Sequence, residues 1–110
     1  DFLAWVLGDE AMNLLWLEKT GLSPARADLL AIVDYISDDN PDAAQRLKDD
    51  IEAKAAKLPE RPKLYRPGRV AGTREMVVRA NYVVVYMEDT RAVSILRVLH
   101  AAQQWPPARE

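Results

Sequence analysis

The chain has 110 residues, no cysteine, and nearly balanced charge, with 15 basic and 17 acidic residues. This length suits a single domain with its own hydrophobic core, and the lack of thiols excludes disulfides and thiolate metal sites. Its apolar runs are far shorter than a membrane span and its acidic start does not resemble a signal peptide, so we expect a cytoplasmic protein that does not use a membrane.

The chain begins with a short stretch before an internal methionine, Met12, which we interpret as the natural start of the domain. We expect residues 1–11 to be an extra segment of uncertain origin, residues 12–107 to form the domain, and residues 108–110 to be a tail. After Met12, the apolar run Asn13–Leu17 fits a short strand at the edge of a sheet. Five residues fit a helical turn as well.

Two helix-start signals follow in the chain, Ser23–Pro24 and Asn40–Pro41. A side chain that can accept from free backbone N–H groups, followed by proline in the first turn, is typical of a helix N-terminus. The first helix is predicted to run to about Ser37 and the second to be stopped by Pro59. Their apolar stripes are Leu29, Ile32, Val33 and Ile36 in the first, and Ala44, Leu47, Ile51, Ala55 and Leu58 in the second. The short link between them predicts an antiparallel hairpin.

A connection rich in proline and arginine, Pro59–Gly72, comes after the second helix and is predicted to be extended. Between Lys54 and Arg79 there are eight basic and two acidic residues, a local charge of 8 − 2 = +6. This asymmetry indicates an anionic partner for one face of the protein. A solvated linker that balances the acidic helices explains it equally well.

Three runs rich in β-branched and aromatic residues complete the domain: Thr73–Arg79, Tyr82–Glu88 and Ala92–His100. Short polar breaks separate them, which predicts an antiparallel meander. The middle run is apolar on both faces, so we expect it at the centre of the sheet. The residues therefore predict an α+β fold, in which an N-terminal helical hairpin packs on one face of a small antiparallel β-sheet.

This order of elements resembles the RelE/ParE superfamily of bacterial toxins, the toxic halves of type II toxin–antitoxin (plasmid stabilisation) modules. The matching residues are Asp39–Ala44 at the second helix, Asn81–Tyr86 in the central strand, Ile95–His100 in the last strand, and Trp105 after it. The resemblance implies a cognate antitoxin that inserts an amphipathic helix or a strand into apolar grooves of the toxin.

The superfamily divides by mechanism. RelE-like members cut messenger RNA on the ribosome without a metal or cofactor, whereas ParE-like members poison DNA gyrase and are not nucleases. We favour the ribonuclease mechanism, because the basic stretch suits phosphate; the gyrase poison is the alternative, and an inactive antitoxin-binding scaffold is a third. Ala101 and Ala102 stand where RelE carries a Lys-Arg pair, and this departure counts against efficient RNA cleavage.

The resemblance makes Arg79 and His100 the candidate catalytic residues, with Lys54, Lys57 and Arg74 as candidate substrate-binding residues. An arginine can stabilise the charge of a phosphorane with two hydrogen bonds, and a histidine can transfer protons near neutral pH. The pair would form a minimal metal-free ribonuclease if both side chains lie on one face of the sheet.

Each of these residues also has a structural interpretation. Arg79 fits a surface arginine paired with a helix acid such as Asp49 or Glu52, and His100 fits a capping or buried hydrogen-bonding histidine. Strand alternation puts Arg97 on the same face as Val93, Ile95 and Leu99, as a structural ion-pair partner. Trp105 is expected to cover the open end of the sheet.

Overall fold

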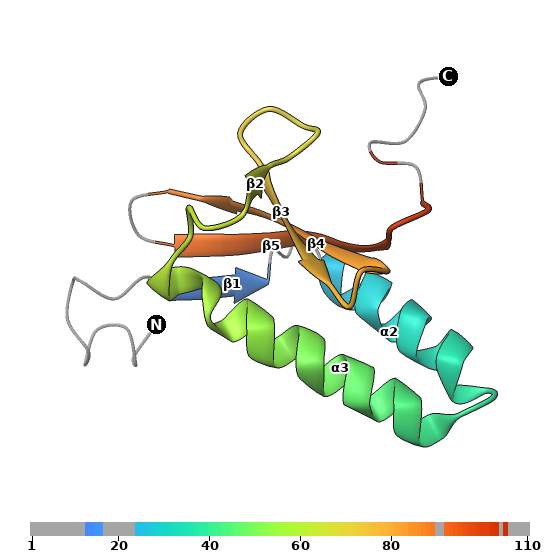
Figure 1. Cartoon of the computed structure of the whole chain (residues 1–110). Helices are drawn as coiled ribbons and strands as arrows, with labels where there is room; N and C mark the ends of the chain where they lie inside the picture. The colour runs from blue at the N-terminus through green and yellow to red at the C-terminus, as the bar shows by residue number, and fades with distance from the viewer. Residues whose placement is uncertain (1–12, 17–23, 90–91, 104, 106–110) are drawn as a thin grey trace.

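The computed structural model describes residues 13–16, 24–89, 92–103 and 105. Within these residues, two helices pack on one side of a five-stranded sheet, as Figure 1 shows. The helices are α2 (Pro24–Ser37) and α3 (Pro41–Ala56), followed by the short 3₁₀ helix η1 (Leu58–Glu60). The strands are β1 (Asn13–Trp16), β2 (Arg66–Pro67), β3 (Arg74–Val78), β4 (Tyr82–Glu88) and β5 (Ala92–His100). The predicted α+β fold is confirmed.

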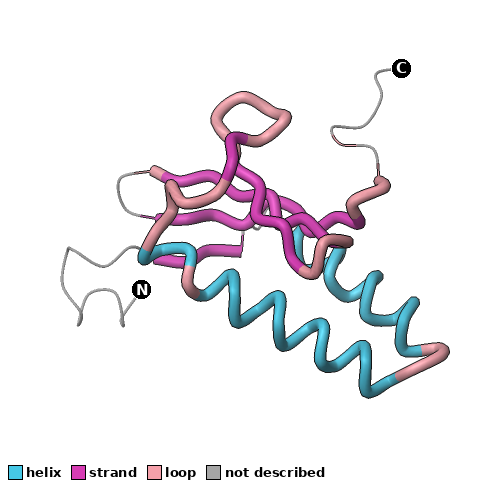
Figure 2. The backbone as a smooth tube through the Cα atoms, viewed as in Figure 1, coloured by secondary structure: helices cyan, strands magenta, loops and turns pink. Residues whose placement is uncertain are grey.

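The strands lie side by side in the order β1-β5-β4-β3-β2, which puts β4 at the centre as its sequence predicts. β2, β3, β4 and β5 form an antiparallel meander, and β1 joins the outer edge of β5 in parallel. Figure 2 shows the two helices as an antiparallel pair beneath this sheet. Residues 1–11 and 108–110, which we interpret as an extra segment and a tail, lie outside the described residues. Among the described residues, no helix is long and apolar enough to cross a membrane.

The helix boundaries follow the local signals with one difference. α2 begins at Pro24, and α3 begins after Asn40, whose side chain accepts the Ala43 N–H at 3.0 Å. α3 ends at Ala56, three residues before Pro59. Its last turn tightens to a 3₁₀ bond from Lys57 N–H to the Lys54 carbonyl at 3.2 Å, and Pro59 lies inside η1. Proline is tolerated there because the first positions of a helical turn lack N–H partners in any case.

The sheet buries apolar side chains on both of its faces. The helix-facing core joins the buried sides of α2 and α3 to alternate residues of the three long strands, including Met76, Val84, Tyr86 and Ile95. On the opposite face, Val83, Val85 and Leu99 form a second cluster, against which Leu96 and Trp105 pack. Trp105, which we expected to cover the open end of the sheet, thus packs on this face. Both faces of β4 are therefore buried, which explains its continuous apolar sequence.

A β-bulge in β5 changes the face on which Arg97 lies. Val85 pairs with Arg97 but its neighbour Tyr86 pairs with Ile95, so that β5 carries an extra residue at this point. An extra residue reverses the alternation of side chains beyond it. The prediction that Arg97 shares a face with Val93 and Ile95 is therefore wrong, because those two residues lie in the helix-facing core whereas Arg97 pairs with Val85 of the second cluster.

Arg97 is nevertheless a structural ion-pair partner, as its place in an apolar strand predicts. Its Nε and Nη2 atoms donate to the two carboxylate oxygens of Asp28 in α2, at 2.6 and 2.9 Å. Asp28 also accepts the backbone N–H of Val98 at 3.0 Å. The pairing of β1 with β5 ends at Ile95, so β1 does not pair with this part of β5. The hydrogen bond that Arg97 donates to Asp28 raises the pKa of the guanidinium further, against the opposing effect of partial burial. One carboxylate thus ties α2 to the open edge of β5.

Tyr86, the largest fully buried side chain of the sheet, carries a hydroxyl that needs a partner. It donates to the backbone carbonyl of Pro62 at 2.6 Å and so fixes the connection after η1 against β4. Burial raises the pKa of the Tyr86 phenol, which stays neutral and keeps this donor.

We predict that Asp28→Ala lowers the free energy of unfolding by about 2 kcal/mol, because it leaves a part-buried guanidinium and an edge N–H without their shared acceptor. Asp34→Ala, an exposed change on the same helix, should cost less than about 0.5 kcal/mol. Urea unfolding of both variants measures the difference. Equal losses would show that the Asp28 contacts do not hold the helix to the strand.

Candidate functional site

The β3–β4 hairpin positions Arg79. Val78 pairs with Tyr82, so the turn consists of Arg79, Ala80 and Asn81, closed by a 2.6 Å bond from Asn81 N–H to the Arg79 carbonyl. Arg79 and Ala80 have positive φ angles of 54° and 61°, in the left-handed region that residues other than glycine rarely adopt. A turn with two such residues matches the twist of a tight hairpin. Its backbone points the Arg79 side chain towards α3.

Asp50 of α3 is the partner of Arg79. The Arg79 Nε donates to Asp50 at 3.1 Å, and its Nη2 donates to the Arg46 carbonyl at 3.4 Å. Lys54 approaches the other carboxylate oxygen of Asp50 at 3.4 Å. Desolvation raises the pKa of Asp50, but the hydrogen bonds and charges of Arg79 and Lys54 outweigh it and hold the pKa below its ordinary value. A helix acid thus pairs with Arg79, and it is Asp50 instead of Asp49 or Glu52.

His100, at the end of β5, is exposed and lies against the ring edge of its cross-strand neighbour Tyr82, with the ring centroids 5.4 Å apart. Its Nδ1 accepts the backbone N–H of Ala102 at 3.1 Å. His100 therefore caps the turn after β5, as one of its two structural interpretations predicts, and it is not buried. On its α2 side it lines an apolar groove of about 300 Å³ with Tyr35, Ile36 and Tyr82.

The pairing Val78–Tyr82–His100 brings the two candidate catalytic residues to the same end of the sheet. Their side chains are engaged in different places, because Arg79 contacts α3 whereas His100 lines the groove beside α2. No hydrogen bond joins the two side chains among the described residues. Their catalytic roles remain predictions.

The three candidate substrate-binding residues divide between two places. Lys54 and Lys57 line a pocket of about 220 Å³ at the end of α3, together with Leu58, Glu60, Arg61, Leu64 and Tyr65. Arg74 does not line this pocket but contacts its wall, donating to the Tyr65 carbonyl at 2.8 Å, and it approaches Glu88 at 3.8 Å. In the described residues, no cluster of histidine, aspartate and glutamate could hold a metal ion.

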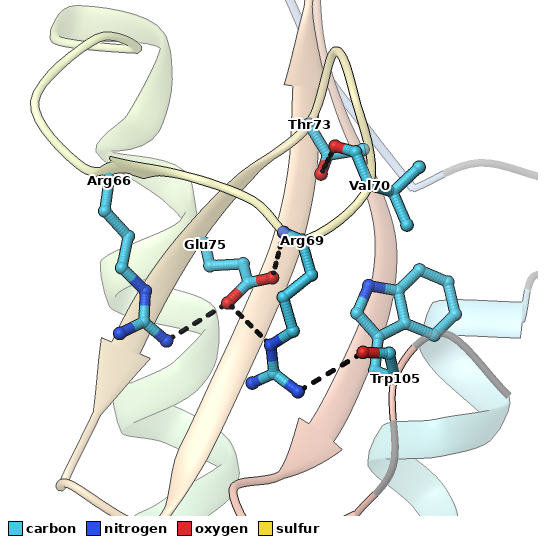
Figure 3. Close-up of polar contacts among 6 residues, drawn as sticks. All are labelled: Arg66, Arg69, Val70, Thr73, Glu75 and Trp105. Carbon is cyan, nitrogen blue, oxygen red and sulfur yellow. Dashed lines mark hydrogen bonds and ion pairs between the residues drawn. The ribbon is translucent and has the colours of Figure 1, made fainter. Parts of the chain in front are cut away.

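The structure also contains a cluster of one buried acid and two arginines that was not predicted from the sequence. Glu75 of β3 has a side chain only 1% exposed, and it binds both Arg66 and Arg69 from the connection before it (Figure 3). The signal in the sequence is Glu75 itself, one of the two acids within the basic stretch, at an alternating position of an apolar strand. The acid alone does not reveal its partners, because Arg66 lies opposite it in the two-residue strand β2 and Arg69 lies in the loop after that strand.

Comparison with known proteins gives the class of this fold and site. Residues 22–105 match the family model of the ParE toxin of the type II toxin–antitoxin system parDE. The chain therefore belongs to the ParE toxin family, within the RelE/ParE superfamily that its sequence resembles.

Individual relatives agree with this assignment. “Putative toxin Y4kP” of Sinorhizobium fredii is 43% identical over 72 residues, which cover 66% of this chain and 75% of that protein. Toxin RelE2 of Caulobacter vibrioides is 42% identical over 81 residues, covering 72% and 89% of the two chains. A solved structure of the chromosomal ParDE TA system from P. aeruginosa matches with a TM-score of 0.71 and 25% identity, over 83% of this chain and 97% of that one.

We predict that Arg79→Ala raises the pKa of the Asp50 carboxyl towards its ordinary value of 3.8, because the variant loses a hydrogen bond and a positive charge. In the wild type the ion pair is complete at neutral pH and is lost only as the pH falls through the lowered pKa. Carbon-detected NMR titration of the Asp50 side chain measures both values. In Arg46→Ala, which removes a nearby arginine but keeps the carbonyl acceptor, the pKa should stay as in the wild type.

Proposed function

We propose that this chain arrests bacterial growth by poisoning DNA gyrase and has no nuclease activity of its own. The observation that carries the proposal is the engagement of Arg79 with Asp50 of α3, whereas His100 lines the groove beside α2. A metal-free ribonuclease needs a free cation at the phosphate and a proton-transfer group within hydrogen-bond reach of the same substrate. The match to the ParE family model supports the same mechanism.

Ribosome-dependent cleavage of messenger RNA is the second candidate function. The observation that favours it is the pocket at the end of α3, in which Lys54, Lys57 and Arg61 outnumber the single acid Glu60. Such a pocket suits the phosphate of a single strand, with Tyr65 at its wall available for contact with a base. In this mechanism the substrate would have to displace Asp50 from Arg79, because the paired guanidinium has less capacity to bind a phosphorane.

A type II toxin has a cognate antitoxin, and the groove beside α2 suits an amphipathic segment of such a partner. Its lining is mainly apolar and includes Tyr35 of α2, whose side chain is 81% exposed. A large aromatic side chain left in water beside an apolar groove is typical of a surface that a partner covers. We propose that the antitoxin occupies this groove.

The mechanism can be tested by inducible expression of the chain in bacteria, beside Arg79→Ala and the control Arg46→Ala. A gyrase poison predicts growth arrest with DNA breaks and intact messenger RNA. Because no catalytic step depends on Arg79, we expect Arg79→Ala to arrest growth about as well as the control. The measurements are DNA-break scoring and sequencing of messenger RNA ends from the same cultures.

Other outcomes of this experiment have equally direct meanings. Cuts in messenger RNA at codon-phased positions, lost in Arg79→Ala and kept in Arg46→Ala, would overturn the gyrase proposal and establish the ribonuclease. A folded chain that causes no arrest at all would favour the inactive antitoxin-binding scaffold.

We predict that Tyr35→Asp weakens binding of the cognate antitoxin at least roughly tenfold, because a charge at an aromatic anchor of the groove opposes apolar burial. Asp34→Ala changes the neighbouring exposed position and should leave the affinity nearly unchanged. Calorimetric titration of the purified antitoxin into each variant provides the measurement. Equal affinities for wild type and Tyr35→Asp would exclude this groove as the antitoxin site.

A further inference from the structure

We infer that Arg66 and Arg69, held next to one another by the buried Glu75, form a binding site for the phosphate backbone of duplex DNA. The choice of DNA over other anions rests on the proposed function, since gyrase acts on DNA. The site itself is argued from the geometry of three side chains, from β2, β3 and the loop between these strands, shown in Figure 3.

Glu75 holds the two arginines with both of its carboxylate oxygens. Oε1 accepts from Arg66 Nη2 at 3.1 Å and lies 3.5 Å from Arg69 Nε, while Oε2 accepts the backbone N–H of Arg69 at 2.9 Å. A carboxylate buried in this way requires compensating charge and hydrogen bonds. Its position between two strands therefore fixes the guanidinium groups relative to the sheet.

Both guanidinium groups remain available to a ligand. The side chain of Arg66 is 55% exposed and that of Arg69 is 41% exposed. Arg66 uses only one of its nitrogen atoms in the hydrogen bonds of the described residues. Arg69 reaches the Trp105 carbonyl at 3.4 Å, a long bond that a phosphate oxygen could replace with a shorter, charge-assisted one.

The loop between β2 and β3 is built to keep this arrangement fixed. Gly68 N–H donates to the Thr73 carbonyl at 2.7 Å, and the Thr73 hydroxyl donates to the Val70 carbonyl at the same distance. A Cβ at Gly68 would lie 2.1 Å from the Thr73 hydroxyl oxygen, so a side chain there would displace this contact. A rigid loop reduces the entropy lost when two arginine side chains bind a ligand.

The charge and shape of the site favour a phosphodiester. Two arginines against one carboxylate leave one positive charge, and the planar guanidinium matches the oxygens of a phosphate in a bidentate manner. The loop lies on the side of the sheet away from the two helices, as Figure 1 shows, where an extended rod can approach without meeting the helical hairpin. A contact with backbone phosphates positions a protein on DNA without reading its sequence.

The test is fluorescence anisotropy of a labelled 20-base-pair duplex with the full chain, without gyrase, over a series of salt concentrations. We expect the double variant Arg66→Gln/Arg69→Gln to bind roughly tenfold or more weakly at low salt and its salt slope to fall by about one to two, as expected for lost phosphate contacts. Arg46→Gln removes one arginine from α3 and should leave both quantities nearly unchanged. Wild-type-like binding by the double variant would overturn the inference.

The variant Glu75→Gln distinguishes the effect of how the two arginines are oriented from the effect of the net charge of the site on DNA binding. Simple attraction predicts tighter DNA binding, since the variant gains one positive charge, whereas loss of the ionic hold on the arginines predicts weaker binding. We expect weaker binding, and a result equal to or tighter than the wild type would contradict the role of Glu75. If this variant fails to fold, Arg66→Lys/Arg69→Lys keeps the charge but not the bidentate fork, and should bind several-fold more weakly.

Two further arms separate this inference from the proposed function. Tighter binding of a single-stranded RNA of the same sequence than of the duplex would overturn the choice of DNA. Binding of an acidic protein surface alone, with no affinity for either nucleic acid, would overturn the phosphate site. Gyrase-dependent DNA cleavage is scored separately, so a toxin that binds DNA through these arginines but does not affect gyrase refutes only the proposed function.

Discussion

The burial of β4 on both faces is the constraint on which the rest of this structure depends. A strand of seven residues that runs Tyr-Val-Val-Val-Tyr-Met-Glu cannot leave either face in water without a large loss of hydrophobic free energy. The helical hairpin covers one face, and Trp105 with the second cluster covers part of the other. The helices, the basic connection and Trp105 are therefore all arranged around one central strand.

Three carboxylates connect these layers, and each does so through arginine. Asp28 joins α2 to β5, Asp50 joins α3 to the β3–β4 turn, and Glu75 joins the basic loop to β3. Arg97 also lies over the ring of Trp105, 5.4 Å from its centroid. The Asp28–Arg97 pair therefore contacts the aromatic side chain that packs on the second apolar cluster. Many of the arginines that suggest a nucleic-acid enzyme in the sequence thus stabilise the fold.

This use of arginine bears directly on the mechanism. An arginine whose guanidinium is paired in the resting protein serves catalysis only if the substrate competes for it, whereas a gyrase poison needs no such step. Basic side chains outnumber acids at the pocket at the end of α3 and at the pair Arg66–Arg69. Neither place contains Arg79 or His100. The groove beside α2, which His100 does line, is mainly apolar and suits a protein partner instead.

The sequence by itself determined the α+β class, the helix starts at Pro24 and Pro41, and the central place of β4. These features depend on local signals, namely capping residues, apolar periodicity and a strand that is apolar on both faces. Arg97 was recognised as an ion-pair partner for the same reason, since a cation inside an apolar strand needs an acid.

The three-dimensional packing sets which acid pairs with which arginine and on which face each arginine lies. The bulge at Leu96 and Arg97 leaves no mark in the apolar pattern, because both faces of β5 are apolar, yet it reverses the alternation beyond it. Asp50, and not Asp49 or Glu52, meets Arg79 because the positive φ angles of the hairpin turn set the direction of that side chain. Glu75 meets Arg66 as its cross-strand neighbour in β2, and it meets Arg69 because Gly68 and Thr73 fold the loop back onto β3. Contacts of this kind depend on the spatial meeting of distant segments, which a linear pattern of residues does not encode.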